Sequence, residues 1–147
     1  MGKNRSSPAR WCLLVGFVSV AAAGCGHRAD LPPTAKVSGT VRLDGQPLPR
    51  GTVQFVPDAA KGTEGPPGVG YIEENGDYEI ITAGVKGAVV GHHKIGVKAE
   101  EEYDQTAISM GPSLIPRRYN NPETSDLAAE VKKGEKNEIP LELSSRP

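Results

Sequence analysis

The chain has 147 residues, enough for one domain of ordinary size with short appendages, and its 18 glycines and 13 prolines disfavour long helices. Lys3, Arg5 and Arg10 carry all the charge before residue 26, so the remaining chain holds 14 basic and 18 acidic residues. This weakly acidic balance, without a basic patch, argues against nucleic acid as a partner.

Residues 1–24 have the pattern of an export signal. The three basic residues precede the uncharged run WCLLVGFVSVAAA at residues 11–23. As a helix this run would span about 20 Å, less than the roughly 30 Å hydrocarbon core of a bilayer, which disfavours a permanent transmembrane helix. A buried core helix is the alternative, and it is disfavoured because no amphipathic helix elsewhere could cover its face.

The stretch AAGC, Ala22–Cys25, resembles the lipobox of bacterial lipoproteins, in which small residues precede an acceptor cysteine. The resemblance implies that Cys25 carries diacylglycerol through a thioether and becomes the mature N-terminus, although leucine is commoner than alanine at position 22. Several acyl chains, such as palmitate, on one residue anchor a protein durably. Plain secretion is the alternative, and it would leave Cys25 as a free thiol in an oxidising compartment.

Residues 25–36 are predicted to be the lipidated N-terminus and a tether, because GHRADLPPTAK is polar and contains a proline pair. Gly26 stands where an aspartate would resemble an inner-membrane retention signal, which favours the outer membrane. The predicted location is the cell envelope, with the protein lipid-anchored and facing the periplasm or the cell surface.

The chain from residue 37 to residue 143 shows the two-residue period of short, half-buried strands. VSGTVRL at 37–43 is followed by the turn signal Asp44-Gly45, and TVQFVP at 52–57 is expected to return beside it. Asn75-Gly76 separates VGYIEE from YEIIT and predicts a hairpin with a type I′ turn.

In the second half of the chain, HHKIGVKAE at residues 92–100 is predicted to place His93, Ile95, Val97 and Ala99 on one face. Residues 101–126 have no clear period. LAAEVKK, the turn GEKN and EIPLEL are expected to form a closing hairpin, in which Pro140 requires an edge strand or a position whose nitrogen side points outward.

Seven short strands, at turn spacings of about 8–12 residues, predict an all-β fold. The specific expectation is an antiparallel β-sandwich of seven to eight strands over residues 37–143, with residues 144–147 as a C-terminal tail. A domain of this size buries roughly two-thirds of its unfolded surface, which is enough for stability without a disulfide or a metal.

Four stretches carry a family resemblance: VSGTVRLDGQPLPRGTVQFVP, NGDYEIIT, GHHKIGV and LIPRRYNNPETSDLAAEVKKGEKNEIPLEL. They resemble the carboxypeptidase-regulatory-like, transthyretin-like lipoproteins of planctomycete bacteria, over nearly all of residues 37–143. The resemblance implies a prealbumin-like sandwich with no established enzymatic activity. It reveals no ligand.

Three groups of residues have the chemistry of a site, and each is better explained without one. His92 and His93 point to opposite faces of a strand and cannot ligate one metal together. The acidic run at residues 100–104 lacks the spacing of a calcium loop, so a solvated loop is favoured. Lys36 and Asn137 could meet in an isopeptide crosslink, but both are expected at solvated turns. The sequence therefore predicts no metal and no cofactor.

The candidate binding patch is IPRRYNN, because arginine and tyrosine are typical interface anchors and loops often carry function; its residues are Arg117, Arg118, Tyr119 and Asn120. The alternative is that this loop merely packs on the sandwich.

The expected function is a non-catalytic, lipid-anchored cell-envelope module that contacts the membrane through its anchor. It would act in protein or glycan interaction or in envelope structure. The alternative is a diverged transthyretin-like hydrolase, or an accessory subunit of an envelope enzyme. A pocket that joins His92 or His93 with Arg117 or Arg118 would support this alternative.

Overall fold

The computed structural model describes Gly2 and residues 31–101 and 111–146. Within these ranges the chain forms strands and turns with two short 3₁₀ helices, η1 (Ala59–Lys61) and η2 (Arg117–Asn120), so the predicted all-β class is confirmed. The described part contains no helix that is long and apolar enough to cross a bilayer. Apart from Gly2, the predicted signal peptide lies outside the described residues, as do Cys25 and the last three residues of the acidic run.

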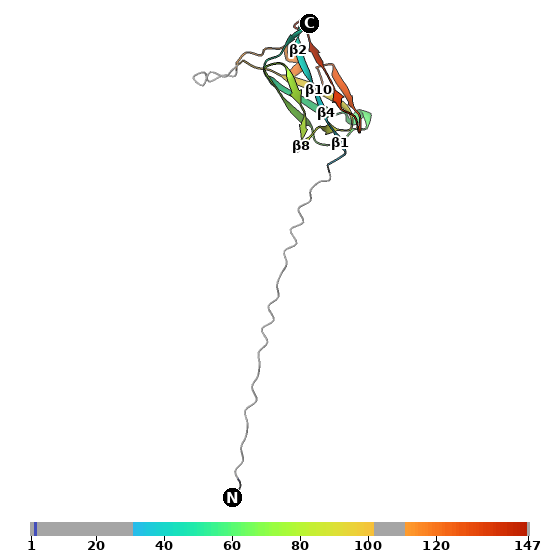
Figure 1. Ribbon diagram of the computed structural model, residues 1–147. Helices are drawn as coiled ribbons and strands as arrows, with labels where there is room; N and C mark the ends of the chain where they lie inside the picture. The colour runs from blue at the N-terminus through green and yellow to red at the C-terminus, as the bar shows by residue number, and fades with distance from the viewer. Residues whose placement is uncertain (1, 3–30, 102–110, 147) are drawn as a thin grey trace.

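Most strands belong to one sheet, with the order β11-β10-β4-β5-β6-β2-β12, which curls so that its inner face encloses the core (Figure 1). β3 and β13 also pair with β2, β7 pairs with β5 and β8, and β1 pairs separately with β9. The bounds are β1 Thr34–Ala35, β2 Val37–Leu43, β3 Gln46–Pro47, β4 Gly51–Pro57, β5 Gly68–Ile72, β6 Asp77–Glu79, β7 Ile81–Thr82, β8 Val85–Lys86, β9 Ala88–Val89, β10 Gly91–Lys98, β11 Leu127–Val131, β12 Asn137–Glu138 and β13 Leu141–Leu143.

The core lies between the inward-facing residues of β2, β4 and β10. The predicted inward face is confirmed on β10 and the residue after it, because His93, Ile95, Val97 and Ala99 are all buried. The centre is formed by branched aliphatic side chains around Phe55, which suits a pleated inner surface. The fully buried side chains of this centre are Val37, Val41, Val53, Phe55, Ile80, Ile95 and Val97.

The predicted closing hairpin is wrong. β11 pairs antiparallel with β10, whereas β12 and β13 pair with β2 in parallel. Asn137 closes the turn between β11 and β12, because its side chain accepts a hydrogen bond from Lys132 N and donates to the carbonyls of Lys132 and Glu135. These bonds close the turn locally, and the chain after it joins the far edge of the sheet, where Pro140 needs no ladder N–H.

The strand that was expected to return beside β2 also pairs elsewhere. Asp44 and Gly45, with φ angles of 49° and 82°, form the predicted tight turn, but only β3 returns beside β2. Pro47 and Pro49 cannot donate to a ladder, so this pairing ends after two residues and β4 joins β5 and β10 instead.

The β5–β6 hairpin is confirmed through the pair Ile72–Tyr78, but its turn is not of type I′. Gly76 has a φ of 88°, whereas Asn75 is not among the described residues with positive φ. The Asn75 carboxamide accepts a hydrogen bond from Asp77 N at 3.0 Å, which holds Asn75 in an Asx-type turn instead.

Ile139, between β12 and β13, crosses directly over Gly39 of β2. A Cβ atom at Gly39 would lie 2.0 Å from the Ile139 carbonyl oxygen. The same oxygen accepts a hydrogen bond of 2.6 Å from the Tyr78 hydroxyl, and Ile139 N donates to Ser38 O at 2.8 Å. The parallel edge strand therefore depends on the missing side chain at position 39.

Replacing Gly39 with alanine is expected to lower the free energy of unfolding by about 2–3 kcal/mol, because the added methyl group would overlap the Ile139 carbonyl. Urea unfolding measures this loss from the shift of the midpoint. Ser38→Ala, on the neighbouring residue, is the control and is expected to change stability by less than about 0.5 kcal/mol. Equal midpoints for the two variants would contradict the crossing.

Candidate functional site

The four predicted binding residues lie together in η2, but the structure divides them between two environments. Tyr119 is buried and Arg118 is half-buried. Arg117 is exposed, and Asn120 is half-buried on the outer side of the sheet. A 3₁₀ helix has about three residues per turn, so consecutive side chains point in different directions.

Arg118 and Tyr119 hold the C-terminal tail. Arg118 Nη2 donates hydrogen bonds to the carbonyls of Ser144 at 2.8 Å and Arg146 at 2.6 Å, and to the Tyr119 hydroxyl at 3.0 Å. The Tyr119 hydroxyl accepts from Ser144 N at 3.0 Å, and the Arg118 guanidinium lies 4.6 Å from the centre of the Tyr119 ring. The polar groups of Arg118 and Tyr119 are therefore already bonded within the chain.

The segment after η2 is seated on the outer face of β10. Gly96 has no side chain, and Pro122 packs against it so closely that a Cβ atom at Gly96 would lie 2.9 Å from Pro122 Cδ. Leaving out the side chain at this single position allows the segment to approach the sheet.

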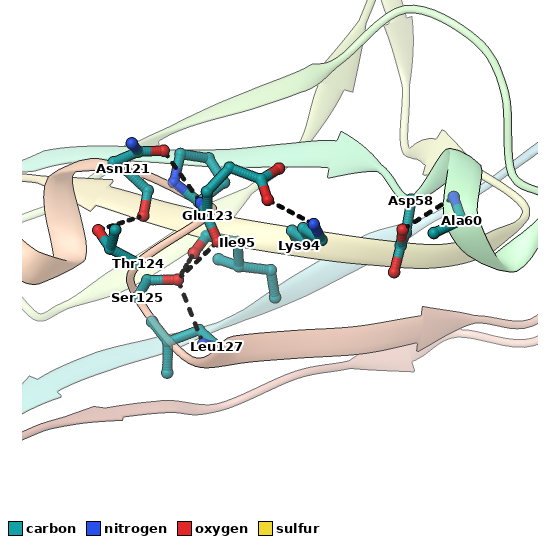
Figure 2. A network of polar contacts seen from close by, with 10 residues as sticks. Asp58, Ala60, Lys94, Ile95, Asn121, Glu123, Thr124, Ser125 and Leu127 are labelled. Atoms are coloured by element: carbon teal, nitrogen blue, oxygen red, sulfur yellow. Dashed lines mark hydrogen bonds and ion pairs between the residues drawn. The ribbon is translucent and has the colours of Figure 1, made fainter.

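Polar contacts then fix the segment along β10, as Figure 2 shows. Ser125 Oγ donates a hydrogen bond to the Ile95 carbonyl and accepts one from Leu127 N at 3.2 Å. Glu123 forms an ion pair with Lys94 at 2.5 Å, which raises the pKa of Lys94 through their hydrogen bond. Because these contacts come from two successive β10 residues and both ends of the segment, η2 is held beside the sheet.

Two rows of outward-facing side chains cross β5, β4 and β10 next to this segment. The register places Tyr71 opposite Thr52 and Thr52 opposite Lys98. One step further along the strands, Val69 is opposite Gln54, and Gln54 is opposite Gly96. Directly opposed residues have Cβ atoms about 4.5–5.5 Å apart, so the side chains within each row adjoin, and the second row ends at Gly96, which has no side chain.

Three adjoining hollows follow these rows, with volumes of about 200, 320 and 470 Å³. Thr52 and Lys98 line both the 200 Å³ and the 320 Å³ hollow. Asn120 lines both the 200 Å³ and the 470 Å³ hollow, and Glu100 lines both the 320 Å³ and the 470 Å³ hollow. We call this surface the outer groove; its polar side chains are Thr52, Gln54, Lys98, Glu100, Arg117 and Asn120, with Tyr71 beside it.

Several groups in the outer groove lack partners within the described part of the chain. Asn120 Oδ1 is buried and accepts no hydrogen bond, a condition that costs about 1–3 kcal/mol. Lys98 and Arg117 form no ion pair there, and Glu100 is the carboxylate among the described lining residues. Tyr71 is 77% exposed. The groove therefore combines an aromatic ring and, as far as the described residues go, an unused acceptor and two cations without an ion pair.

The two histidines are not brought together with the arginines of η2. His93 is buried against Phe55, with ring centres 5.7 Å apart, whereas His92 lies on the opposite face of β10, as predicted. Along an extended strand, His92 is roughly 25 Å from Glu100, beside which Arg117 lines the groove. The arrangement that would have supported the enzyme alternative does not form among these residues. Likewise, the described part of the chain contains no group of three or more metal-ligating residues.

Lys36 and Asn137 do meet, but through the backbone of Lys36. Its carbonyl accepts hydrogen bonds from Asn137 N at 3.1 Å and from Asn137 Nδ2 at 3.2 Å. Asn137 is buried rather than solvated, and its carboxamide closes the turn described above, while Lys36 is exposed. This geometry gives no support to an isopeptide crosslink.

No protein-family model matches the chain, and neither a curated protein nor a solved structure is significantly similar to it. The resemblance to planctomycete lipoproteins therefore stays a prediction.

Sequence reasoning missed Thr52, Gln54, Tyr71 and Lys98. The alternating pattern of each strand indicates that these residues point outward. The sequence does not indicate that β4 lies between β5 and β10, which is what brings them together.

Arg118→Gln is expected to release the C-terminal tail, because it removes the bonds to Ser144 and Arg146. Amide hydrogen exchange at Ser144 should accelerate, and stability should fall by about 1–3 kcal/mol. Arg117→Gln, the adjacent arginine in the groove, is the matched control and should change neither quantity. Similar exchange at Ser144 in both variants would show that Arg118 does not hold the tail.

Stability is expected to fall in mild acid because of His93. Burial lowers the pKa of His93 below its usual 6.5. The hydrogen bond with the Gly91 carbonyl acts in the opposite direction and raises the pKa, whereas the charge of His92 lowers it further. The unfolded chain therefore binds the proton more readily. The stability contributed by neutral His93 is complete above pH 6.5 and is lost as the pH falls towards the lowered pKa.

Urea unfolding from about pH 7.5 to about pH 5 measures this loss. His93→Phe, or His93→Gln if the larger ring prevents folding, should have a flatter pH profile than the wild type. His92→Gln should keep most of the wild-type slope, because burial is the main cause of the lowered pKa of His93 and His92 is the smallest of its causes. Parallel profiles for the wild type and the His93 variant would contradict the assignment.

Proposed function

We propose that this protein is a non-catalytic, lipid-anchored module of the cell envelope that binds a protein or glycan partner through the outer groove. The observation that carries the proposal is the groove itself. Among the described residues, Lys98 and Arg117 form no ion pair there and Asn120 Oδ1 accepts no hydrogen bond, beside the exposed ring of Tyr71. In this proposal the curled sheet is a prealbumin-like sandwich, and the chain is related to the planctomycete lipoproteins that it resembles.

The groove is suited to binding because strands position much of it. Thr52, Gln54 and Lys98 lie on the paired strands β4 and β10, so their backbone is already fixed in the free protein. Tyr71 is fixed in the same way by its pairing with Thr52. A surface that is ordered in advance loses less conformational entropy on binding, which raises affinity for a given contact area.

The position of the groove also suits a membrane anchor. β1, where the described domain begins, lies at one end of the molecule, and the C-terminal end lies at the other (Figure 1). Thr34–Ala35, expected in the tether, instead pair with β9, which leaves residues 26–33 between Cys25 and the first strand. Fully extended, this stretch would reach at most about 29 Å. An anchor at Cys25 would place β1 nearest the membrane and direct η2, whose Arg118 binds the C-terminal tail, away from it.

Chemical labelling of lysines tests whether the groove is occupied in the envelope. The full chain is produced in an exporting bacterium, and lysine modification is compared between isolated envelopes and the purified protein in mild detergent. Lys98 reports on the groove, and Lys86, on β8 and paired with Glu79, is the control outside it.

The proposal predicts that Lys98 is protected in envelopes relative to the purified protein, whereas Lys86 reacts equally in both. Cys25→Ser should lose the added acyl mass, leave the membrane fraction and lose the protection of Lys98. Equal labelling of Lys98 in both preparations would overturn the binding role, and membrane retention of Cys25→Ser would overturn the anchor.

A further inference from the structure

We infer that the ligand of the outer groove is an acidic glycan, that is, an oligosaccharide that carries both hydroxyl and carboxylate groups. This inference rests on the proposed binding function and specifies its ligand class. Three features of the groove lead to it: a flat aromatic ring, one unused amide acceptor beside a second amide, and two cations partly balanced by one carboxylate.

Tyr71 supplies the aromatic surface. Its side chain is 77% exposed on an otherwise paired strand, and it stands beside Thr52 in the outward row. A tyrosine ring joins an apolar face to a polar hydroxyl group. The C–H face of a sugar ring has the matching shape, and the hydroxyl groups at its edge can reach the polar side chains of the neighbouring strand.

Asn120 requires a hydrogen-bond donor. Its buried Oδ1 accepts no hydrogen bond from the described protein, and it lies in the same hollow as Gln54 and Thr52. A carboxylate or phosphate has no proton to donate here, whereas a sugar hydroxyl group can donate to Asn120 and accept from Gln54. A ligand with hydroxyl groups therefore satisfies Asn120, whereas a ligand whose polar groups are all carboxylates or phosphates does not.

Lys98 and Arg117 require acceptors. Neither forms an ion pair within the described residues, and an arginine fork matches a carboxylate with two parallel hydrogen bonds. Glu100 lies between them, shared by the hollow that contains Lys98 and the hollow that contains Arg117. Its charge would repel a dense polyanion, so a carboxylate on some of the sugar rings fits better than a continuous run of phosphates.

The adjoining hollows give room for a chain rather than a single sugar. From Gly96 to Glu100 the groove follows about 13 Å of β10 and its extension, and it continues towards Arg117. An oligosaccharide lying along it would contact Tyr71 and Asn120 with hydroxyl-bearing rings and Lys98 and Arg117 with carboxylates.

Calorimetric titration of the full chain in mild detergent tests the inference with three matched hexamers. Hexagalacturonate carries hydroxyl and carboxylate groups, its carboxyl-reduced form carries hydroxyl groups alone, and a hexaglutamate peptide carries carboxylates without sugar hydroxyls. The variants are Tyr71→Ser, Lys98→Gln, Arg117→Gln and Asn120→Ala. Lys86→Gln is the control that removes one positive charge outside the groove.

Hexagalacturonate is expected to bind, with affinity lowered about tenfold by each groove variant and unchanged by Lys86→Gln. The reduced hexamer and the peptide should bind at least about tenfold more weakly. Equal binding of the reduced hexamer, stronger binding of the peptide, or binding that the groove variants leave unchanged would each overturn the inference. Failure of all three hexamers would also overturn it, while protection of Lys98 in envelopes would still decide the binding function separately.

Discussion

The close contact between Gly96 and Pro122 is the constraint on which the rest of the site depends. All outward positions of β10 except Gly96 carry a side chain. Gly96 is therefore the position where the segment after η2 can lie against the strand. The ion pair of Glu123 with Lys94 and the hydrogen bond of Ser125 to Ile95 then fix that segment in place (Figure 2). The segment after η2 therefore stands beside the outer face of β10, and the sheet face next to it forms a groove.

The same seating gives the short helix η2 two roles. Its inner side, Arg118 and Tyr119, ties the C-terminal tail to the domain through hydrogen bonds to Ser144 and Arg146. Its outer side, Arg117 and Asn120, lines the groove. The tail is thus connected to the groove wall. Substitutions in four consecutive residues therefore have separable effects, on tail stability or on the groove, according to the direction of each side chain.

Local sequence pattern predicted the all-β class, the inward face of β10 and the tight turn at Asp44-Gly45, because period and turn chemistry are properties of neighbouring residues. Strand partners were not predictable in this way. The turn between β11 and β12 is closed by the carboxamide of Asn137, and the parallel edge depends on Ile139 reaching Gly39 across the molecule. Two of the predicted binding residues, Arg117 and Asn120, line the groove, but their strand-borne neighbours are assembled by a register that the sequence does not display.

Amide hydrogen exchange of Gly96→Val tests the central claim most directly, since valine suits a strand but would displace Pro122. The claim predicts faster exchange at Thr124 and Leu127, whose amides donate within the seated segment, and unchanged exchange at Ile80, whose amide donates to Val37 in the core. Unaltered protection of Thr124 and Leu127 in the valine variant would contradict it.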